Sequence, residues 1–202
     1  MPGTRIALPH LLALVAALGA ADARAQTVQI TPFAGYAFGG AVSDPVLSET
    51  HSFEAALDYG GTISFPVSEG WRFELLYSRQ PTRLGGGLGP SFDVRIERYL
   101  AGFQEETGKG RARWFGTASL GATRFVPGVA GLDSETRFGA AFGLGVKAFA
   151  TRNLGLRLEA RALYTLVSGS GGVFCSSGTC LFTFSGSSLW QGDVSGGLIL
   201  AF

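Results

Sequence analysis

The sequence predicts an all-β protein, specifically an eight-stranded antiparallel up-and-down transmembrane β-barrel. Three observations predict it. Apolar and polar residues alternate with period two in successive segments, which is the period of a β-strand. Short and long connections alternate between those segments, as in barrels that cross a membrane. Charged residues make up only 15% of the 202 residues, well below the ~25% of soluble domains, so water alone is a poor match for the surface.

Five segments alternate cleanly, and three weaker ones complete the set. In the second segment Phe53 and Leu57 share one face, while Glu54 and Asp58 share the other. The predicted strands are residues 28–38, 53–65, 71–78, 92–104, 112–125, 137–147, 154–164 and 190–202. Arg98 falls on the apolar face of the fourth strand, so we expect a β-bulge near it to restore the register.

The connections indicate which end of the barrel is which. Three are short turns, at residues 66–70, 105–110 and 150–153. Four are longer and rich in Gly, Ser and Pro, at residues 40–51, 80–90, 126–136 and 166–187. In bacterial outer-membrane barrels the short turns are periplasmic and the long loops extracellular. An even number of strands then returns both chain ends to the periplasmic side.

The polar face of the strands carries seven acidic and seven basic residues. A closed interior explains this balance, because an unpaired buried charge costs several kcal/mol, and the glycines between them leave room for these side chains. We predict an interior salt-bridge network of Glu54, Asp58, Arg72, Glu74, Arg95, Glu97, Arg137, Lys147, Arg157, Glu159, Arg161 and Asp193. A soluble lipocalin-like carrier, whose apolar face would point inward, is the alternative.

Residues 1–25 have the pattern of a secretory signal peptide. Arg5 precedes an apolar stretch at residues 6–20, and residues 23–25 match the small-x-small site that signal peptidase reads. The stretch is shorter than the ~20 apolar residues of a transmembrane helix. We therefore expect residues 26–202 to form the barrel domain. That domain has 14 basic and 14 acidic residues, so it lacks the positive field that nucleic-acid binding requires.

Several stretches also carry a family likeness, at residues 30–40, 113–125, 138–147 and 197–202. They resemble the small outer-membrane β-barrel family that includes the transmembrane domain of outer-membrane protein A, outer-membrane protein X and the opacity-type proteins. The resemblance implies a location in the outer membrane of a Gram-negative bacterium, with extracellular loops and contacts to outer-membrane lipid and lipopolysaccharide. It also implies that Leu198, Leu200 and Phe202 are the signal read by the barrel-assembly machinery.

The longest connection contains the only two cysteines, Cys175 and Cys180. Export would place them in an oxidising compartment, so we predict a disulfide between them. Two thiols without a nearby His or Asp do not complete a zinc shell. We expect the apolar residues on either side, 173–174 and 181–184, to extend the last two strands as a hairpin; an adhesive tip is the alternative.

His51 is the only histidine outside residues 1–25, so a histidine-dependent site must use it. The resemblance extends to lipid A-modifying enzymes that use His with Ser and an acid near the external rim, and Ser52 and Glu49 lie beside His51. Neighbours on a strand point to opposite faces, however, so this spacing does not place a base beside a nucleophile. An enzyme of this kind is kept as an alternative.

The sequence thus predicts a monomeric outer-membrane barrel with a plugged, salt-bridged interior. Its role is predicted to be structural or to involve surface interaction, with an extracellular ligand bound through the loops. We predict no catalytic residue, no metal ligand and no cofactor. Diffuse strand patterns support a fold far better than an activity.

Overall fold

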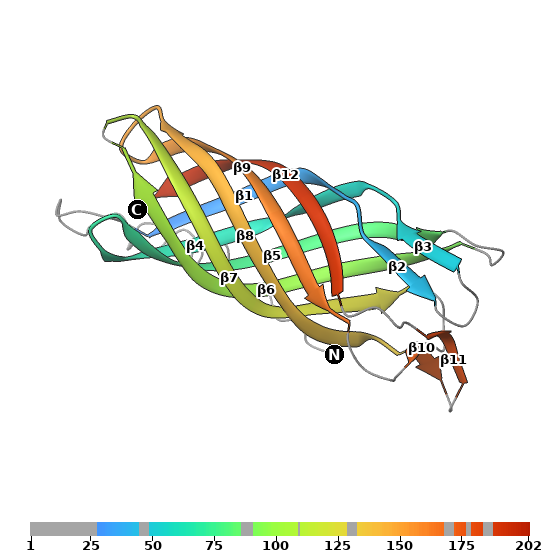
Figure 1. Ribbon diagram of the computed structural model, residues 1–202. Coiled ribbons are helices and arrows are strands. Elements are labelled where there is room, and N and C mark those ends of the chain that lie inside the picture. Colours follow the sequence, from blue (N-terminus) through green and yellow to red (C-terminus); the bar gives the residue numbers. More distant parts are fainter. Residues whose placement is uncertain are drawn as a thin grey trace, which may run out of the picture.

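The computed structural model describes residues 28–44, 49–85, 91–108, 110–128, 133–167, 172–176, 179–183 and 188–202. The predicted signal peptide and its cleavage site lie outside these residues. Within them the only regular secondary structure is β-strand (Figure 1). No helix of this part of the chain has the length and apolar character needed to cross a membrane.

Eight long strands follow one another up and down. They are β1 (Gln29–Phe38), β4 (Ala56–Ser68), β5 (Trp71–Gly85), β6 (Phe92–Thr107), β7 (Ala112–Pro127), β8 (Glu135–Phe149), β9 (Leu154–Leu166) and β12 (Ser188–Ala201). Four short strands lie between them: β2 (Ala41–Asp44), β3 (Glu49–Phe53), β10 (Gly172–Ser176) and β11 (Thr179–Thr183).

The long strands close into a barrel. Each pairs antiparallel with two neighbours, in the order β6-β5-β4-β1-β12-β9-β8-β7 and back to β6. The first and last strands meet along most of their length, from Gln29 opposite Ala201 to Phe38 opposite Gly192. The predicted eight-stranded up-and-down barrel is therefore confirmed, and closure leaves none of the eight with a free edge.

The two ends of the barrel differ. At one end, here called the turn end, short connections join β4 to β5, β6 to β7 and β8 to β9, and β12 ends there. Gly70 has a φ of +77°, which favours glycine, and its carbonyl accepts a 2.7 Å hydrogen bond from the Glu106 amide. The other end, the loop end, carries β2, β3, β10 and β11 (right in Figure 1).

Strand β5 is longer than the sequence predicts, since it continues to Gly85 through part of the expected 80–90 loop. The physical reason is that alternation persists beyond Pro81. Gln80, Thr82 and Leu84 all point inward and are buried, so pairing with β6 continues as far as Leu84 opposite Phe92.

The predicted β-bulge near Arg98 is wrong. The register of β6 with β5 and with β7 runs without interruption past Arg98. Arg98 points inward and is only 1% exposed, and Val94 and Ile96 point inward beside it. The apolar residues at the start of this strand therefore line the interior of the loop end, and no change of face is needed.

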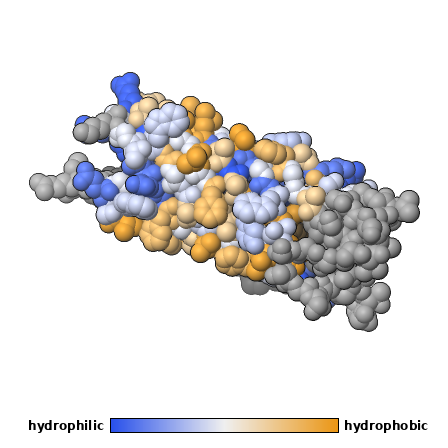
Figure 2. Space-filling view, in the orientation of Figure 1, coloured by the Kyte–Doolittle hydropathy of each residue, from blue (hydrophilic) through white to orange (hydrophobic). Residues whose placement is uncertain are grey.

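The outer surface of the barrel is apolar. Figure 2 shows apolar side chains over the middle of the barrel and hydrophilic ones at the turn end. Leu144 on β8 is 74% exposed and Trp114 on β7 is 69% exposed. Exposed aromatic residues of different strands form a row towards the loop end: Tyr36, Tyr59, Tyr77, Tyr99, Phe138 and Trp190. The rings of Tyr77 and Tyr99 lie 5.1 Å apart. This arrangement is the reverse of a soluble lipocalin, so that alternative is excluded.

Candidate functional site: the charged interior

The centre of the barrel interior holds an arginine clamped between two carboxylates. Arg157 of β9 donates to Glu74 of β5 through two nitrogens, over 2.5 and 3.1 Å, and its Nε donates to Glu159 over 2.9 Å. All three side chains are buried. The fork of the guanidinium group matches the paired oxygens of Glu74, so this contact joins opposite strands of the barrel.

Glu159 extends the cluster to a second arginine. Arg161 donates to Glu159 over 2.8 Å and to Asp193 of β12 over 3.2 Å. The Thr117 hydroxyl donates to the other oxygen of Glu159 over 3.1 Å. Both oxygens of this carboxylate are therefore occupied, as a buried charge requires.

A second cluster lies nearer the turn end and is centred on Glu106. This carboxylate lies 2.7 Å from Lys147, 3.3 Å from Arg113 and 3.8 Å from Arg72. Lys147 is fully buried and also donates to the side-chain carbonyl of Gln29 over 2.8 Å. The sequence prediction missed Glu106 because it assigned residues 105–110 to a turn; continued alternation on β6 is the signal that could have found it.

A third cluster joins Asp58 to Arg98. Their charged groups are 3.7 Å apart, and Arg98 donates to Gln80 over 2.9 Å and to Gln191 over 2.6 Å. Sequence reasoning missed Arg98 because the apolar residues before it, which share its face of the strand, were expected to point outward. Its two glutamine partners come from β5 and β12, so only the closed barrel brings them together.

Small residues make room for these groups. Gly143 on β8 faces the central cluster, and a Cβ atom there would lie 2.4 Å from Thr117 Oγ1 and 2.5 Å from Glu159 Oε1. Aromatic rings fill the remaining space. The guanidinium of Arg157 lies 4.5 Å from the centre of the Phe115 ring, a distance at which a cation and an aromatic face attract.

The loop end of the interior is apolar. One cluster of buried residues consists of Phe53, Leu84, Val94, Ile96, Phe125, Val167 and Leu189. They come from β3, β5, β6, β7 and β12 and from the residue after β9. The rings of Phe53 and Phe125 stack with their centres 6.2 Å apart. Charged clusters in the middle and turn end are therefore followed by an apolar layer at the loop end.

Four residues of the predicted network lie outside the central clusters. Glu54 follows β3 and is exposed. Arg95 and Glu97 are on the outward face of β6 and bind each other over 2.9 Å. The reason is that the apolar residues Val94 and Ile96 of this stretch point inward, so the charged residues between them point outward. Arg137 lies near the loop end of β8 and pairs with its neighbour Glu135, each side chain being 22% exposed.

The remaining site predictions fall partly outside the described side chains. The backbone pairs Cys175 with Cys180 in the β10–β11 hairpin, but their side chains lie outside the description. The predicted hairpin is therefore present, but it forms a separate two-stranded sheet and does not continue the barrel sheet. His51 lies in β3 opposite Val42, and its side chain is likewise outside the description.

The last strand places its three predicted assembly residues on the outer surface at the turn end. Leu198 is 42% exposed and Phe202 is 44% exposed. Leu200 pairs with Ile30 of β1 and with Leu154 of β9. The Phe202 amide donates to the Val28 carbonyl over 3.1 Å, which extends the seam between the two chain ends.

Comparison with solved structures identifies the fold. The chain is similar to Neisserial surface protein A (NspA), with a TM-score of 0.59 and 16% identity over 87% of this chain and 97% of that one. It is also similar to the outer membrane protein OprG from Pseudomonas aeruginosa, with a TM-score of 0.54 and 12% identity over 87% and 97%. No family model matches the chain, and no curated protein sequence matches it. The fold is that of the small eight-stranded outer-membrane β-barrels.

Proposed function

We propose that the protein is an integral outer-membrane barrel without an open pore, whose role is structural or lies in interactions of its surface loops. The supporting observation is the filled interior. Ion pairs connect β5, β9 and β12 across the middle of the barrel, and an apolar cluster occupies the loop end. Such an interior makes a rigid anchor for the long connections, which would face the cell exterior.

The energy of the ion pairs argues against a pore. A continuous water path would require Arg157 to leave Glu74 and Glu159, and Arg161 to leave Asp193. Breaking one buried pair by removing a partner costs about 3–5 kcal/mol. Water entering the barrel would compensate part of this cost, but the apolar layer at the loop end would still have to open.

Conductance in planar lipid bilayers tests the proposal. We expect purified, monomeric protein to give no steady porin-sized current. A boiled sample is the control for contaminating material. Gel migration before and after boiling checks the fold, because an intact barrel should migrate differently in the two samples. Steady, large, ohmic channels from the unboiled monomer would contradict the closed interior.

The proposal includes no catalytic activity. We expect the mass spectra of lipid A from cells with and without the protein to be identical. A new acylated or deacylated species that disappears on substitution of His51→Ala would favour the lipid A-modifying enzyme instead.

Under the same proposal, Leu198, Leu200 and Phe202 direct the chain to the barrel-assembly machinery. Their outward position at the end of β12 leaves them accessible until the barrel is surrounded by lipid. Deletion of Phe202 should lower the amount of protein in the outer membrane while export continues.

A further inference from the structure

A group of arginines lies outside the barrel, beside the aromatic row of the loop end. Arg79 on the outward face of β5 pairs with Tyr59 of β4 on one side and with Glu97 of β6 on the other. Glu97 in turn pairs with Arg124 of β7. Tyr77 lies two residues from Arg79 on the same face, so these charges begin where the apolar surface ends.

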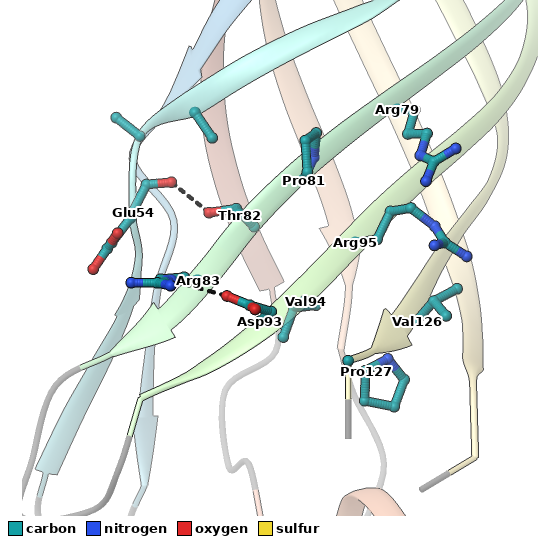
Figure 3. Close-up of a pocket in the computed structure, with 13 residues that line it drawn as sticks. Glu54, Arg79, Pro81, Thr82, Arg83, Asp93, Val94, Arg95, Val126 and Pro127 are labelled. Carbon is teal, nitrogen blue, oxygen red and sulfur yellow. Dashed lines mark hydrogen bonds and ion pairs between the residues drawn. The ribbon is translucent and has the colours of Figure 1, made fainter. Parts of the chain in front are cut away.

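The same surface is hollowed. A cavity of about 480 Å³ is lined by the arginines Arg79, Arg83 and Arg95 and by the acidic residues Glu54 and Asp93. Figure 3 shows the guanidinium groups of Arg79 and Arg95 pointing in one direction, while Arg83 points towards Glu54. We call Arg79, Arg83, Arg95 and Arg124 the external arginine patch.

The arginines of this patch differ in how they are neutralised. Arg83 binds Asp93 over 2.8 Å, and Arg95 binds Glu97 over 2.9 Å. The hydrogen bond and the charge of Asp93 raise the pKa of Arg83. Arg124 donates only to the hydroxyl of Ser134 among the described residues, over 3.0 and 3.3 Å.

Arg79 has no acceptor at all within the described part of the chain. Its Nε is shielded from solvent and makes no hydrogen bond there. The charge of Arg79 is therefore not neutralised by a carboxylate of the described chain, and an anionic ligand in the cavity that Arg79 lines would supply the missing acceptor. The patch has four arginines against the three carboxylates Glu54, Asp93 and Glu97, and two of its cations carry no carboxylate.

We propose that the external arginine patch binds the phosphate group of a glycolipid in the outer leaflet, with Arg79 and Arg95 as its main donors and Arg124 as a further cation. A guanidinium fork matches phosphate oxygens. Tyrosines mark the depth of lipid headgroups in a membrane barrel, and Tyr59 and Tyr77 lie next to Arg79. A lipid-borne phosphate therefore reaches this depth, with its acyl chains along the apolar strands below. The inference rests on the proposed outer-membrane location.

Ligand-induced stabilisation tests the proposal in detergent micelles. The probes are bisphosphorylated lipid A, the same lipid with both phosphates removed, and inorganic phosphate. We expect bisphosphorylated lipid A to raise the thermal midpoint of the full-length barrel. The double substitution Arg79→Gln/Arg95→Gln should weaken its apparent affinity at least about tenfold, as expected for charge-assisted hydrogen bonds.

Two further variants keep the test decisive. Arg152→Gln removes the same charge from an exposed turn at the opposite end and should bind like the wild type. Arg124→Gln perturbs the patch from the next strand and should weaken binding less than the double variant. Gel migration before and after boiling shows that each variant is folded.

Other outcomes overturn the proposal. Equal stabilisation by the dephosphorylated lipid would mean that acyl contacts alone hold it. If inorganic phosphate saturates the site with the same affinity, the ligand is free phosphate and not a lipid. If the double variant binds lipid A as the wild type does, Arg79 and Arg95 are not the binding residues. The conductance measurement tests the closed interior separately from lipid binding. A barrel that conducts but binds lipid A would contradict only the proposed closed interior, and a closed barrel that does not bind lipid A would contradict only the arginine site.

Discussion

Arg157 inside the barrel and Arg79 on its outer face carry the same group in opposite circumstances. Arg157 is 3% exposed and bonds to two carboxylates, Glu74 and Glu159. Arg79 is half-buried and meets no carboxylate within ion-pair distance among the described residues. The interior arginines Arg72, Arg98, Arg157 and Arg161 each lie within ion-pair distance of a carboxylate. Arg79 in the outer patch does not, so its charge is left for an anion from outside the protein.

The difference follows from the surroundings. A charge inside the barrel is shielded from water, so every interior arginine must find its acceptor within the chain. At the edge of a membrane, water and lipid headgroups compete for the same donors. A cation can therefore remain without a protein partner only on the outer surface.

The largest expected effect is at Arg157. Arg157→Ala leaves Glu74 and Glu159 facing each other without their shared cation, and we expect it to lower the free energy of unfolding by about 3–5 kcal/mol. Urea denaturation in lipid vesicles, followed by tryptophan fluorescence, measures the change. Arg152→Ala in an exposed turn is the control. An unchanged denaturation midpoint would mean that Arg157 is exposed to water, and would contradict its assignment to a buried ion pair.

Glu106→Gln should have the next largest effect. The amide keeps the shape and one acceptor but removes the charge shared by Lys147, Arg72 and Arg113, so we expect a loss of about 2 kcal/mol. Lys147 would retain only Gln29 and one neutral oxygen. The same denaturation assay measures the change. A variant more stable than the wild type would show that the negative charge of Glu106 does not stabilise the neighbouring cations.

Gly143→Ala tests whether the interior is tightly filled. The added methyl group would clash with Thr117 and Glu159, so we expect a loss of about 1–2 kcal/mol from overpacking. Gly116→Ala on the neighbouring strand is the matched control, since its Cβ would meet Leu144 at an ordinary 3.6 Å. Equal stability of the two variants would indicate a looser interior.

Arg79→Gln should have the smallest effect on stability. Because Arg79 makes no ion pair within the described chain, we expect the free energy of unfolding in lipid-free detergent to change by less than about 0.5 kcal/mol. A loss comparable to that of Arg157→Ala would mean that the outer patch is part of the structural network.

Several residues of the predicted interior network lie inside the barrel. Asp58, Glu74, Arg157, Glu159 and Asp193 lie on clean period-two segments, and the structure places all of them inside. The errors gather at residues 92–97. There the outward face carries Asp93, Arg95 and Glu97, because this part of β6 lies beyond the apolar belt and its inward face packs in the loop-end core.

The sequence by itself determined the strands and the barrel, because period two is a local property and because alternating connection lengths allow few topologies. Only the tertiary structure decided which charges meet. Arg157 and Glu74 are 83 residues apart, and Arg98 and Gln191 are 93 apart. Such pairs depend on the stagger between strands and on closure of β1 against β12, which bring together side chains that no local pattern relates.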